Sequence, residues 1–176
     1  MWASMPAVLP KAMEGMEWVT GWAKHTATVG QAVSWVAPNG LRVVSQYEKF
    51  KKRNIKSVAF KSRIVMSEPT GEINIKKTAQ AVAPNFIHSL DGSHLDFIIL
   101  RARQEGVVVV AIHDDYGTYA ADTAWLHRVI REEFVKMYQD NNILERMGRS
   151  SGYKVPPPAK GELNISDVLN SPYFFS

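Results

Sequence analysis

The chain contains no cysteine and no long apolar run among its 176 residues. Without cysteine, neither a disulfide framework nor a cysteine-based zinc site can form. The longest apolar run, residues 107–112, is far too short to span a bilayer, and the N-terminal residues lack the features of a signal peptide. Hydrophobic residues make up 45% of the chain, which is enough to build a core. We therefore expect a soluble intracellular domain, placed in the cytoplasm and without a membrane partner.

Common catalytic signatures are missing as well. The sequence holds no glycine-rich phosphate loop, no serine-nucleophile motif and no Rossmann fingerprint. No pair among its five histidines has the helical spacing that marks a zinc site. Attention therefore turns to single carboxylates and to the distribution of charge.

Acidic residues are nearly absent from one segment, residues 47–63. It holds one acid, Glu48, and seven basic residues, so this segment carries +6 in a chain whose net charge is +4. The basic residues are Lys49, Lys51, Lys52, Arg53, Lys56, Lys61 and Arg63. A local positive charge of this size indicates a polyanionic partner. Aromatic and apolar residues between the charges favour an ordered arm, although composition alone also allows a solvated loop.

The first half of the chain is expected to begin with a helix and to continue as β-structure. Apolar spacing over residues 6–28 is compatible with a helix, which Pro10 interrupts. Residues 32–47 predict a hairpin, because the sequence Asn-Gly at its centre tolerates the positive φ of a tight turn. A second hairpin is expected from residues 57–66 and 72–76, joined by the turn-like sequence at 68–71. The basic segment would then project as a β-structured arm.

Helices dominate the expectation for the second half. Residues 85–104 predict a helix that Pro84 starts and Gly106 ends. A further helix is expected from a cap at Asp122 to Tyr138, followed by a short helix near residues 143–147.

Between these helices, the apolar run 107–112 predicts a buried strand that ends at His113, Asp114 and Asp115. A carboxylate held at the end of a rigid strand suits Mg²⁺, which prefers hard oxygen ligands. Two-metal nucleotidyl transfer needs at least two converging acids, and the strand period turns Asp115 away from Asp114. From spacing alone, Asp114 fits either a metal ligand or a polar turn. His88, which has no partner at the helical spacing of a zinc site, fits either a site residue or a structural one.

Two longer motifs carry more information than these single residues. They are Ala83-Pro-Asn-Phe-Ile-His-Ser-Leu-Asp-Gly-Ser-His-Leu95 and Ala111-Ile-His-Asp-Asp-Tyr-Gly-Thr118. In order and separation they closely resemble the C-terminal part of bacteriophage-type single-subunit DNA-directed RNA polymerases, a family that includes the mitochondrial enzymes. The hairpin sequence Trp35-Val-Ala-Pro-Asn-Gly40 and the later Pro158-Ala-Lys-Gly-Glu-Leu-Asn-Ile165 agree with this resemblance. It covers residues 32–176, and residues 1–31 more loosely.

The resemblance implies an α+β fold that forms the C-terminal portion of a right-hand polymerase. An antiparallel palm hairpin would pack with helices, and a β-hairpin arm would project from them. Residues 1–31 would end the fingers, and residues 32–82 would form β-hairpins that include the basic specificity loop. Residues 83–150 would supply part of the palm with the catalytic hairpin, and residues 151–176 a C-terminal foot.

Residue roles also follow from the resemblance. Asp114 matches the second of two palm aspartates that bind the catalytic Mg²⁺ ions, and His113 matches the neighbour that helps to shape that site. His88 matches a residue that touches the minor-groove side of the base pair or hybrid. The arm corresponds to the specificity loop, which enters the promoter major groove, but its residues are not matched one by one. On physical grounds Arg53 and Asn54 suit base edges, and the lysines suit phosphates.

The family's first palm aspartate and its nucleotide-gripping fingers residues have no counterpart in this sequence. We therefore expect a chain that does not polymerise alone and that is completed by an upstream polypeptide. The implied partners are template DNA and promoter duplex, the RNA product and nucleoside triphosphates.

Two other functions stay open at this point. A family-A DNA polymerase palm also places a His-Asp pair on a hairpin, but typically with Glu where this chain has Asp115, and it lacks the Pro-Asn-Phe-x-His-Ser motif. A non-catalytic module could bind nucleic acid through the basic arm without using any acid.

Overall fold

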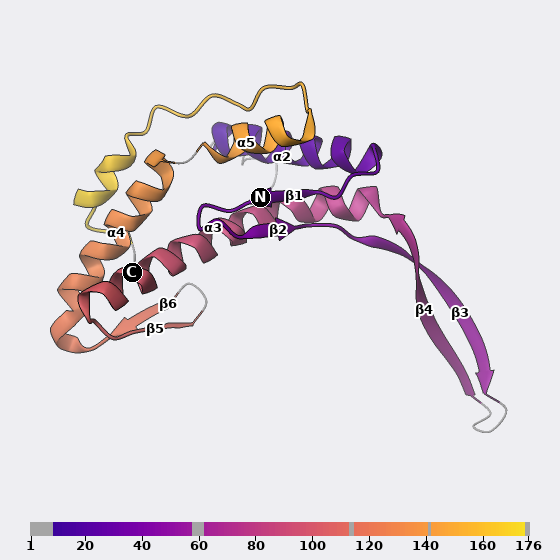
Figure 1. Ribbon diagram of the computed structural model, residues 1–176, viewed down its shortest axis with the longest axis horizontal. Helices are drawn as coiled ribbons and strands as arrows, with labels where there is room; N and C mark the ends of the chain where they lie inside the picture. Colours follow the sequence, from indigo (N-terminus) through magenta and orange to yellow (C-terminus); the bar gives the residue numbers. More distant parts are fainter. Residues whose placement is uncertain (1–8, 58–61, 113–114, 141, 175–176) are drawn as a thin grey trace.

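The computed structural model describes residues 9–57, 62–112, 115–140 and 142–174. A body of helices carries three separate two-stranded antiparallel sheets, and one of these sheets projects far from the body (Figure 1). The helices are α2 (Pro10–Thr28), α3 (Ile75–Glu105), α4 (Thr123–Asp140) and α5 (Ile143–Ser151), with short 3₁₀ turns at Ala120–Asp122 and Ile165–Asn170. The strands are β1 (Ser34–Val36), β2 (Arg42–Val44), β3 (Glu48–Ser57), β4 (Ser62–Ile73), β5 (Val109–Ile112) and β6 (Asp115–Thr118). Within these ranges, none of the helices is both long and apolar enough to cross a membrane.

The larger core lies where α2, α3 and α5 meet the β1–β2 hairpin. The ring of Trp35 contacts both Trp22 and Phe86 edge to face, with centroids 6.4 and 6.1 Å apart. Buried indoles need a partner for their N–H. Trp22 Nε1 donates to Ser151 Oγ at 2.6 Å, and Trp35 Nε1 donates to Ser89 Oγ at 2.9 Å. The tryptophans therefore bury their apolar rings without leaving a polar group unpaired.

A smaller core joins α3, α4, the β5–β6 hairpin and the C-terminal segment. Ile98, Leu126 and Ile130 are buried there, and Tyr116 and Phe174 pack against them. This core holds the β5–β6 hairpin against the helices. The two strands matter because, in the sequence, they flank positions 113 and 114, which include the candidate catalytic acid.

Several expectations from the sequence are confirmed. The fold is α+β with antiparallel hairpins. Asn39 and Gly40 lie in the turn between β1 and β2, where Gly40 has φ +87°. Gly106 ends α3 in the left-handed conformation, φ +73°, as expected of a glycine after a helix. The helix after Asp122 is α4, and its stripe contributes Leu126, Val129, Ile130 and Met137 to the buried residues.

The expected turn at residues 68–71 is wrong. These residues lie inside β4, which pairs with β3 in one long ribbon, and Pro69 lies opposite Phe50. The register shifts between Glu48 and Phe50, and Gly71 adopts φ +75°. In a two-stranded ribbon both strands are edges, so a proline is tolerated, and a glycine marks a bulge. Proline and glycine therefore mark an irregularity within the strand.

The start of the long helix is also predicted wrongly. α3 begins at Ile75, nine residues before Pro84, and the expected strand at 72–76 is replaced partly by helix. Asn74 caps the helix, since its side chain accepts a hydrogen bond from the Lys77 amide at 3.0 Å. Thr78, Val82 and Ala83 are buried in the turns before the proline. Pro84 has no backbone N–H and therefore cannot donate a helical hydrogen bond. The packing of the preceding turns nevertheless stabilises the helix on both sides of it.

The apolar run 107–112 is not a strand buried on both faces. Along β5 half-buried and exposed residues alternate, and the side chains of Val110 and Ile112 are 59% and 65% exposed. A two-stranded hairpin packs one face against the helices and leaves the other face open. The exposed face is nevertheless apolar.

Candidate nucleic-acid interface and catalytic hairpin

The basic segment forms the projecting arm, which consists of β3 and β4 (Figure 1). Each of the four basic residues at positions 49–53 is exposed. Lys61 lies outside the described residues, and Lys56 and Arg63 are placed by the backbone register alone, opposite each other. The prediction of an ordered β-structured arm is confirmed for the two strands.

The two faces of the arm differ in charge. Successive strand residues point to opposite faces, so Lys51 and Arg53 share one face while Lys52 and Asn54 share the other. On the first face, Glu68 lies opposite Lys51 and forms an ion pair with Arg53, whose NH1 is 3.7 Å from Glu68 Oε1. We call this the paired face.

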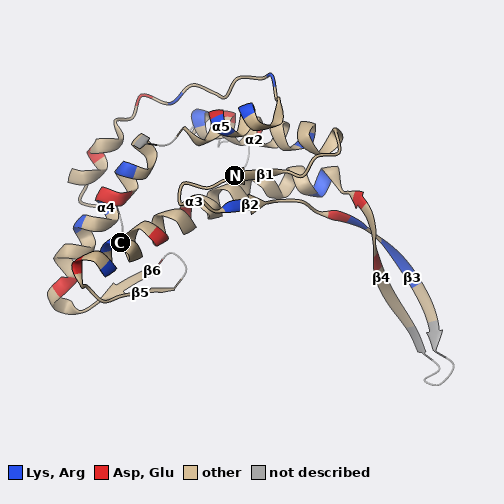
Figure 2. Cartoon of the chain, viewed as in Figure 1, with Lys and Arg blue, Asp and Glu red and all other residues tan. Residues whose placement is uncertain are grey.

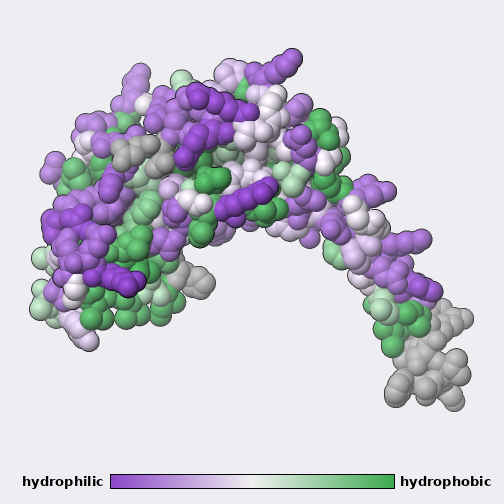
Figure 3. All heavy atoms as spheres, in the orientation of Figure 1, coloured by the Kyte–Doolittle hydropathy of each residue, from purple (hydrophilic) through white to green (hydrophobic). Residues whose placement is uncertain are grey.

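On the second face, Lys52 lies opposite Ser67, and Asn54 lies opposite Val65. Beyond the register shift that follows Glu48, the described pairs of this face carry no acid, and we call it the open face. Closer to the body, Lys49 Nζ bonds Glu72 Oε2 at 2.9 Å. Figure 2 shows the basic residues along β3 and the acids toward the base of the arm. Next to Arg53 and Asn54 the arm also carries apolar residues (Figure 3), since Ile55, Ile64 and Val65 are exposed.

The base of the arm is tied to α3 through Tyr47. The Asn74 amide donates to the Tyr47 carbonyl at 2.7 Å, and the Tyr47 amide donates to Thr78 Oγ1 at 3.2 Å. Asn85 Nδ2 donates to Ser45 Oγ at 2.9 Å and to Tyr47 Oη at 3.3 Å. These bonds anchor the base of the arm to α3.

His88 lies one turn further along α3, with an exposed side chain. Asp91 is exposed on the same helical face, and Gly92 and Leu95 are half-buried. This part of α3 therefore presents a polar and accessible surface. A role for His88 in contacting the base pair or hybrid stays a prediction.

The β5–β6 hairpin is the candidate catalytic element. His113 and Asp114 lie outside the described residues, so their predicted roles stay predictions. The strand ends that flank them are described: Ile112 pairs with Asp115, whose side chain is exposed. In the described part of the chain, no three His, Cys, Asp or Glu residues form a group that could hold a metal ion.

The hairpin is held in place by a residue that the sequence analysis did not single out, His94 on α3. Its ring contacts Tyr116 of β6 and Phe134 of α4 edge to face, with centroids 6.2 and 5.6 Å apart. Its Nε2 is 2.9 Å from the Ile130 carbonyl oxygen. Burial lowers the pKa of His94, although the Ile130 carbonyl and the charges of Asp91 and Glu133 act in the opposite direction. In the folded chain, burial therefore favours the neutral form of the His94 ring.

The sequence analysis also did not predict the contact between Tyr47 and Asn85. Asn85 lies within the first resemblance motif and Tyr47 lies at the edge of the basic segment. Nothing local connects two residues so far apart in sequence, and only the packing of the arm on α3 brings them together. Asn85 and His94 both lie within the motif at residues 83–95, which is the sequence feature that could have identified them.

Comparison with known proteins agrees with this geometry. A family model described as DNA-dependent RNA polymerase matches residues 1–156. The DNA-directed RNA polymerase of Pseudomonas phage phiKMV is 34% identical over 168 residues, which are 95% of this chain and 21% of that protein. DNA-directed RNA polymerase 2B, chloroplastic/mitochondrial, of Nicotiana tabacum is 36% identical over 167 residues, 92% of this chain and 16% of that protein.

A third relative, DNA-directed RNA polymerase 2A of Nicotiana tabacum, is 36% identical over 92% of this chain, which spans 49% of that protein. The chain therefore spans between 16% and 49% of the length of these relatives. The family match runs through the arm, α3 and the β5–β6 hairpin. This chain belongs to the family of phage-type, single-subunit DNA-dependent RNA polymerases.

Proposed function

We propose that this chain takes part in templated RNA synthesis as the C-terminal catalytic portion of a larger polymerase. In this proposal the β3–β4 arm contacts promoter DNA, and the β5–β6 hairpin presents one aspartate to the catalytic Mg²⁺ ions. The observation that carries the proposal is the family match over residues 1–156, which includes both elements. The same match favours an RNA polymerase over the alternative of a family-A DNA polymerase palm.

The arm would bind DNA through its open face. Lys52 has no acid opposite it, since its partner on β4 is Ser67. Lysines suit phosphates, while an amide can pair bidentately with adenine in the major groove. Asn54 is therefore the better candidate for reading a base edge. Arg53, on the paired face, would first have to leave Glu68.

Asp114 would act as a metal ligand between the paired ends of β5 and β6. A carboxylate suits Mg²⁺, and the packing of His94 against Tyr116 supplies the rigidity that a metal ligand needs. When bound, the ions lower the pKa of the attacking RNA hydroxyl and stabilise the pyrophosphate leaving group. The chain's own contribution is to hold the carboxylate in a fixed position, with His113 beside it.

An additional polypeptide segment would complete the site. The proposal requires a second carboxylate, and the described residues offer no acid cluster near the hairpin. The exposed apolar side chains of Val108, Val110 and Ile112 offer a surface for that segment. We infer that the chain alone does not polymerise nucleotides and that docking of the upstream part of a polymerase on this surface restores activity.

Reconstitution tests the catalytic assignment. The chain is mixed with an upstream polypeptide that carries the other palm aspartate, and promoter-dependent RNA synthesis is measured with Mg²⁺ present. Asp114→Asn should abolish synthesis, whereas the matched control Asp115→Asn should keep most of it, because the proposal gives the metal-binding role to Asp114 alone and Asp115 is an exposed residue of β6. Intact synthesis with Asp114→Asn would show that Asp114 is not a required metal ligand.

A purely nucleic-acid-binding module is the second candidate, and the open face of the arm favours it equally. Such a module would bind duplex DNA with strong salt dependence and would leave any reconstituted mixture without synthesis. Binding that survives Asp114→Asn is expected under both functions. Synthesis by the mixture is expected only under the first.

A further inference from the structure

The open face of the arm carries, besides Lys52, a cross-strand pair of uncharged side chains. Asn54 on β3 and Val65 on β4 lie directly opposite each other. Residues directly opposite in an antiparallel ladder point to the same side of the ribbon, with Cβ atoms about 4.5–5.5 Å apart. Both side chains are exposed, and that of Val65 is 56% exposed. The open face therefore presents an amide next to a branched apolar group.

Contacts within the arm do not account for this pair. In the described part of the chain, no residue hydrogen-bonds to the Asn54 side chain, so its amide keeps both its donor and its acceptor for a ligand. On the paired face, Ile55 and Ile64 lie opposite each other, and apolar side chains in such a pair stabilise the ribbon. Val65 faces an amide instead, so the same reason does not explain an apolar residue there.

The arm has the dimensions to carry this pair into a groove of DNA. β3 has 10 residues, which at about 3.3 Å each make a strand of about 33 Å, and the ribbon projects away from the body (Figure 1). The major groove of B-DNA is about 12 Å wide and about 8.5 Å deep, and it admits a two-stranded ribbon. Lys52 lies on the same face, two residues or about 6.7 Å along the strand from Asn54. It can therefore bond a phosphate while the pair faces the bases.

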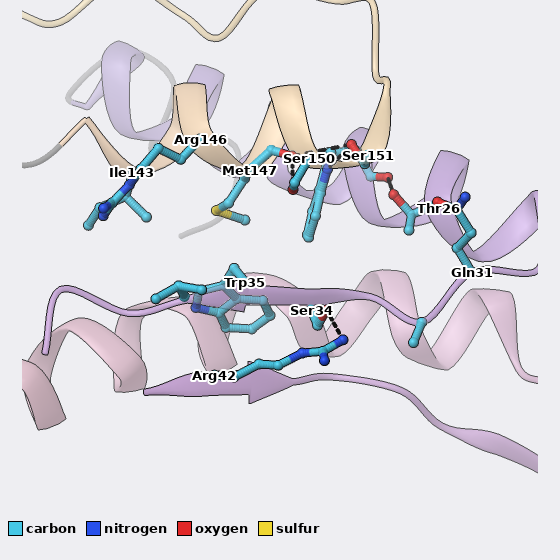
Figure 4. Close-up of a pocket in the computed structure, with 13 residues that line it drawn as sticks. Thr26, Gln31, Ser34, Trp35, Arg42, Ile143, Arg146, Met147, Ser150 and Ser151 are labelled. Atoms are coloured by element: carbon cyan, nitrogen blue, oxygen red, sulfur yellow. Dashed lines mark hydrogen bonds between the residues drawn. The ribbon is translucent and has the colours of Figure 1, made fainter. Parts of the chain in front are cut away.

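A cavity of about 540 Å³ in the body offers a different environment. Figure 4 shows it with α5 on one side and β1 and β2 on the other. Trp22 and Trp35 line it but are only 1% and 4% exposed, and Arg42 NH2 donates to Ser34 Oγ at 3.2 Å. A cavity of this volume suits a small molecule and not a duplex. The base edges of a duplex are therefore accessible to the arm and not to this cavity.

The chemistry of the pair complements an A·T base pair. In the major groove, adenine presents the N7 acceptor and the N6 donor, and thymine presents its C5 methyl group. An asparagine amide bonds N6 and N7 bidentately, and an apolar side chain contacts the methyl group. Guanine presents two acceptors, N7 and O6, which do not match the donor and acceptor of an amide, and a G·C pair has no methyl group.

We propose that Asn54 and Val65 together read A·T pairs of promoter DNA from the major groove. The Asn54 amide bonds the adenine edge, and the Val65 methyl groups pack on the C5 methyl of the thymine in the same or the neighbouring pair. The separation of the two side chains is compatible with either, because neighbouring pairs are about 3.4 Å apart. This inference rests on the proposed contact of the arm with DNA and adds the class of base pair that the arm selects.

The first test removes only the thymine methyl group, so it needs no knowledge of the promoter. Anisotropy at 0.1 M salt compares binding of the chain to an alternating d(A-T) duplex and to the matching d(A-U) duplex. The d(A-T) duplex should bind about fourfold more tightly, as expected for burial of one methyl group. Val65→Ala should lower this ratio toward one, because its shortened side chain no longer reaches the methyl.

Ile64→Ala is the matched control. Ile64 is the neighbour of Val65 on β4 and is 49% exposed, but it belongs to the paired face. This variant should keep the fourfold preference. A difference in duplex shape would give the same preference in every variant. The proposal is overturned if the preference survives Val65→Ala, and also if the unaltered chain shows no preference.

The second test addresses the amide. Replacing adenine with 7-deazaadenine removes the N7 acceptor, so the unaltered chain should bind the modified d(A-T) duplex about fivefold more weakly, the loss of one hydrogen bond. Asn54→Ala should bind the two duplexes equally. Ser67→Ala, also on the open face but opposite Lys52, should keep the difference. Equal binding of both duplexes by the unaltered chain contradicts adenine recognition by Asn54.

The inference and the proposed function can fail separately. If the chain binds all three duplexes equally, with strong salt dependence, the arm remains a DNA contact through its lysines, and only the base readout is overturned. If the chain binds none of these duplexes, both the readout and the proposed contact of the arm with DNA are overturned.

Discussion

Lys52 and Lys49 lie on the same strand with equal charge, yet they should contribute differently to DNA binding. Lys52 lies on the open face opposite Ser67, whereas Lys49 is bonded to Glu72 at 2.9 Å. Each lysine that neutralises a phosphate of duplex DNA contributes about 0.9 to the salt slope. Lys52→Ala should therefore lower the slope by about 0.9 and the affinity at 0.1 M salt by about eightfold.

Lys49→Ala should have a smaller effect, because Glu72 already holds its ammonium group. Both variants lose one positive charge, so this general effect does not distinguish them. At 0.1 M salt, the interaction of that charge with phosphates more than about 10 Å away is largely screened. Glu72→Gln supplies the reverse test: it frees Lys49, so affinity should rise, and Lys49→Ala in that background should cost as much as Lys52→Ala. Anisotropy with duplex DNA of arbitrary sequence measures all four variants. Equal losses for the two single lysine variants would refute the distinction between the faces.

Three further predictions concern stability. Burial lowers the pKa of His94, so below pH about 6.5 the unfolded chain binds more protons than the folded chain. The free energy of unfolding should therefore fall as the pH decreases from about 6.5. Urea titrations at several pH values measure this dependence, and His94→Gln should reduce it. Gly106→Ala meets no atom within 4 Å but must hold φ +73°, so it should cost about 1 kcal/mol in denaturant unfolding; no cost would contradict the strain argument. Asn85→Ala should cost about 1 kcal/mol and speed amide hydrogen exchange at Tyr47 and Asn74, whereas unchanged exchange would show that the arm is anchored without it.

The features that the sequence predicts correctly depend on local chemistry. Asn39-Gly40 forms a turn because both residues tolerate positive φ, and Gly106 ends α3 for the same reason. The stripe of α4 is visible at helical spacing, and most of it is buried. In these places local preference and tertiary packing favour the same structure.

Pro84 and the sequence at 68–71 show where local signals fail. A proline predicts a helix start, but buried Thr78 and Val82 extend α3 upstream of it. Pro69 and Gly71 predict a turn, but the ribbon tolerates them as a bulge. Both errors arise because the signal reports only that regular hydrogen bonding is interrupted. Whether the chain turns, bulges or continues depends on partners elsewhere in the sequence.

The sequence proposes residues for the candidate site, which stay predictions, but it does not reveal how the segments that carry them are arranged. The family motifs identify the hairpin around Asp114, and the charge of residues 47–63 identifies the arm. The division of the arm into two faces depends on the register with β4, which places Glu68 and Ser67 on opposite faces. The supports at Tyr47 and His94 depend on contacts between distant segments, which periodicity cannot reveal.

The burial of β5 was predicted wrongly, and the reason bears on the proposed function. Its apolar sequence predicts a strand covered on both faces, yet the side chains of Val110 and Ile112 are largely exposed. An exposed face in a β-hairpin ordinarily carries polar residues, because an apolar edge invites association. Under the proposed function, the apolar sequence is accounted for if this face packs against another part of the polymerase. That proposal would give β5 two uses: its exposed face would receive another polymerase segment, and its end at Ile112 would lead in sequence to the acid proposed to bind Mg²⁺.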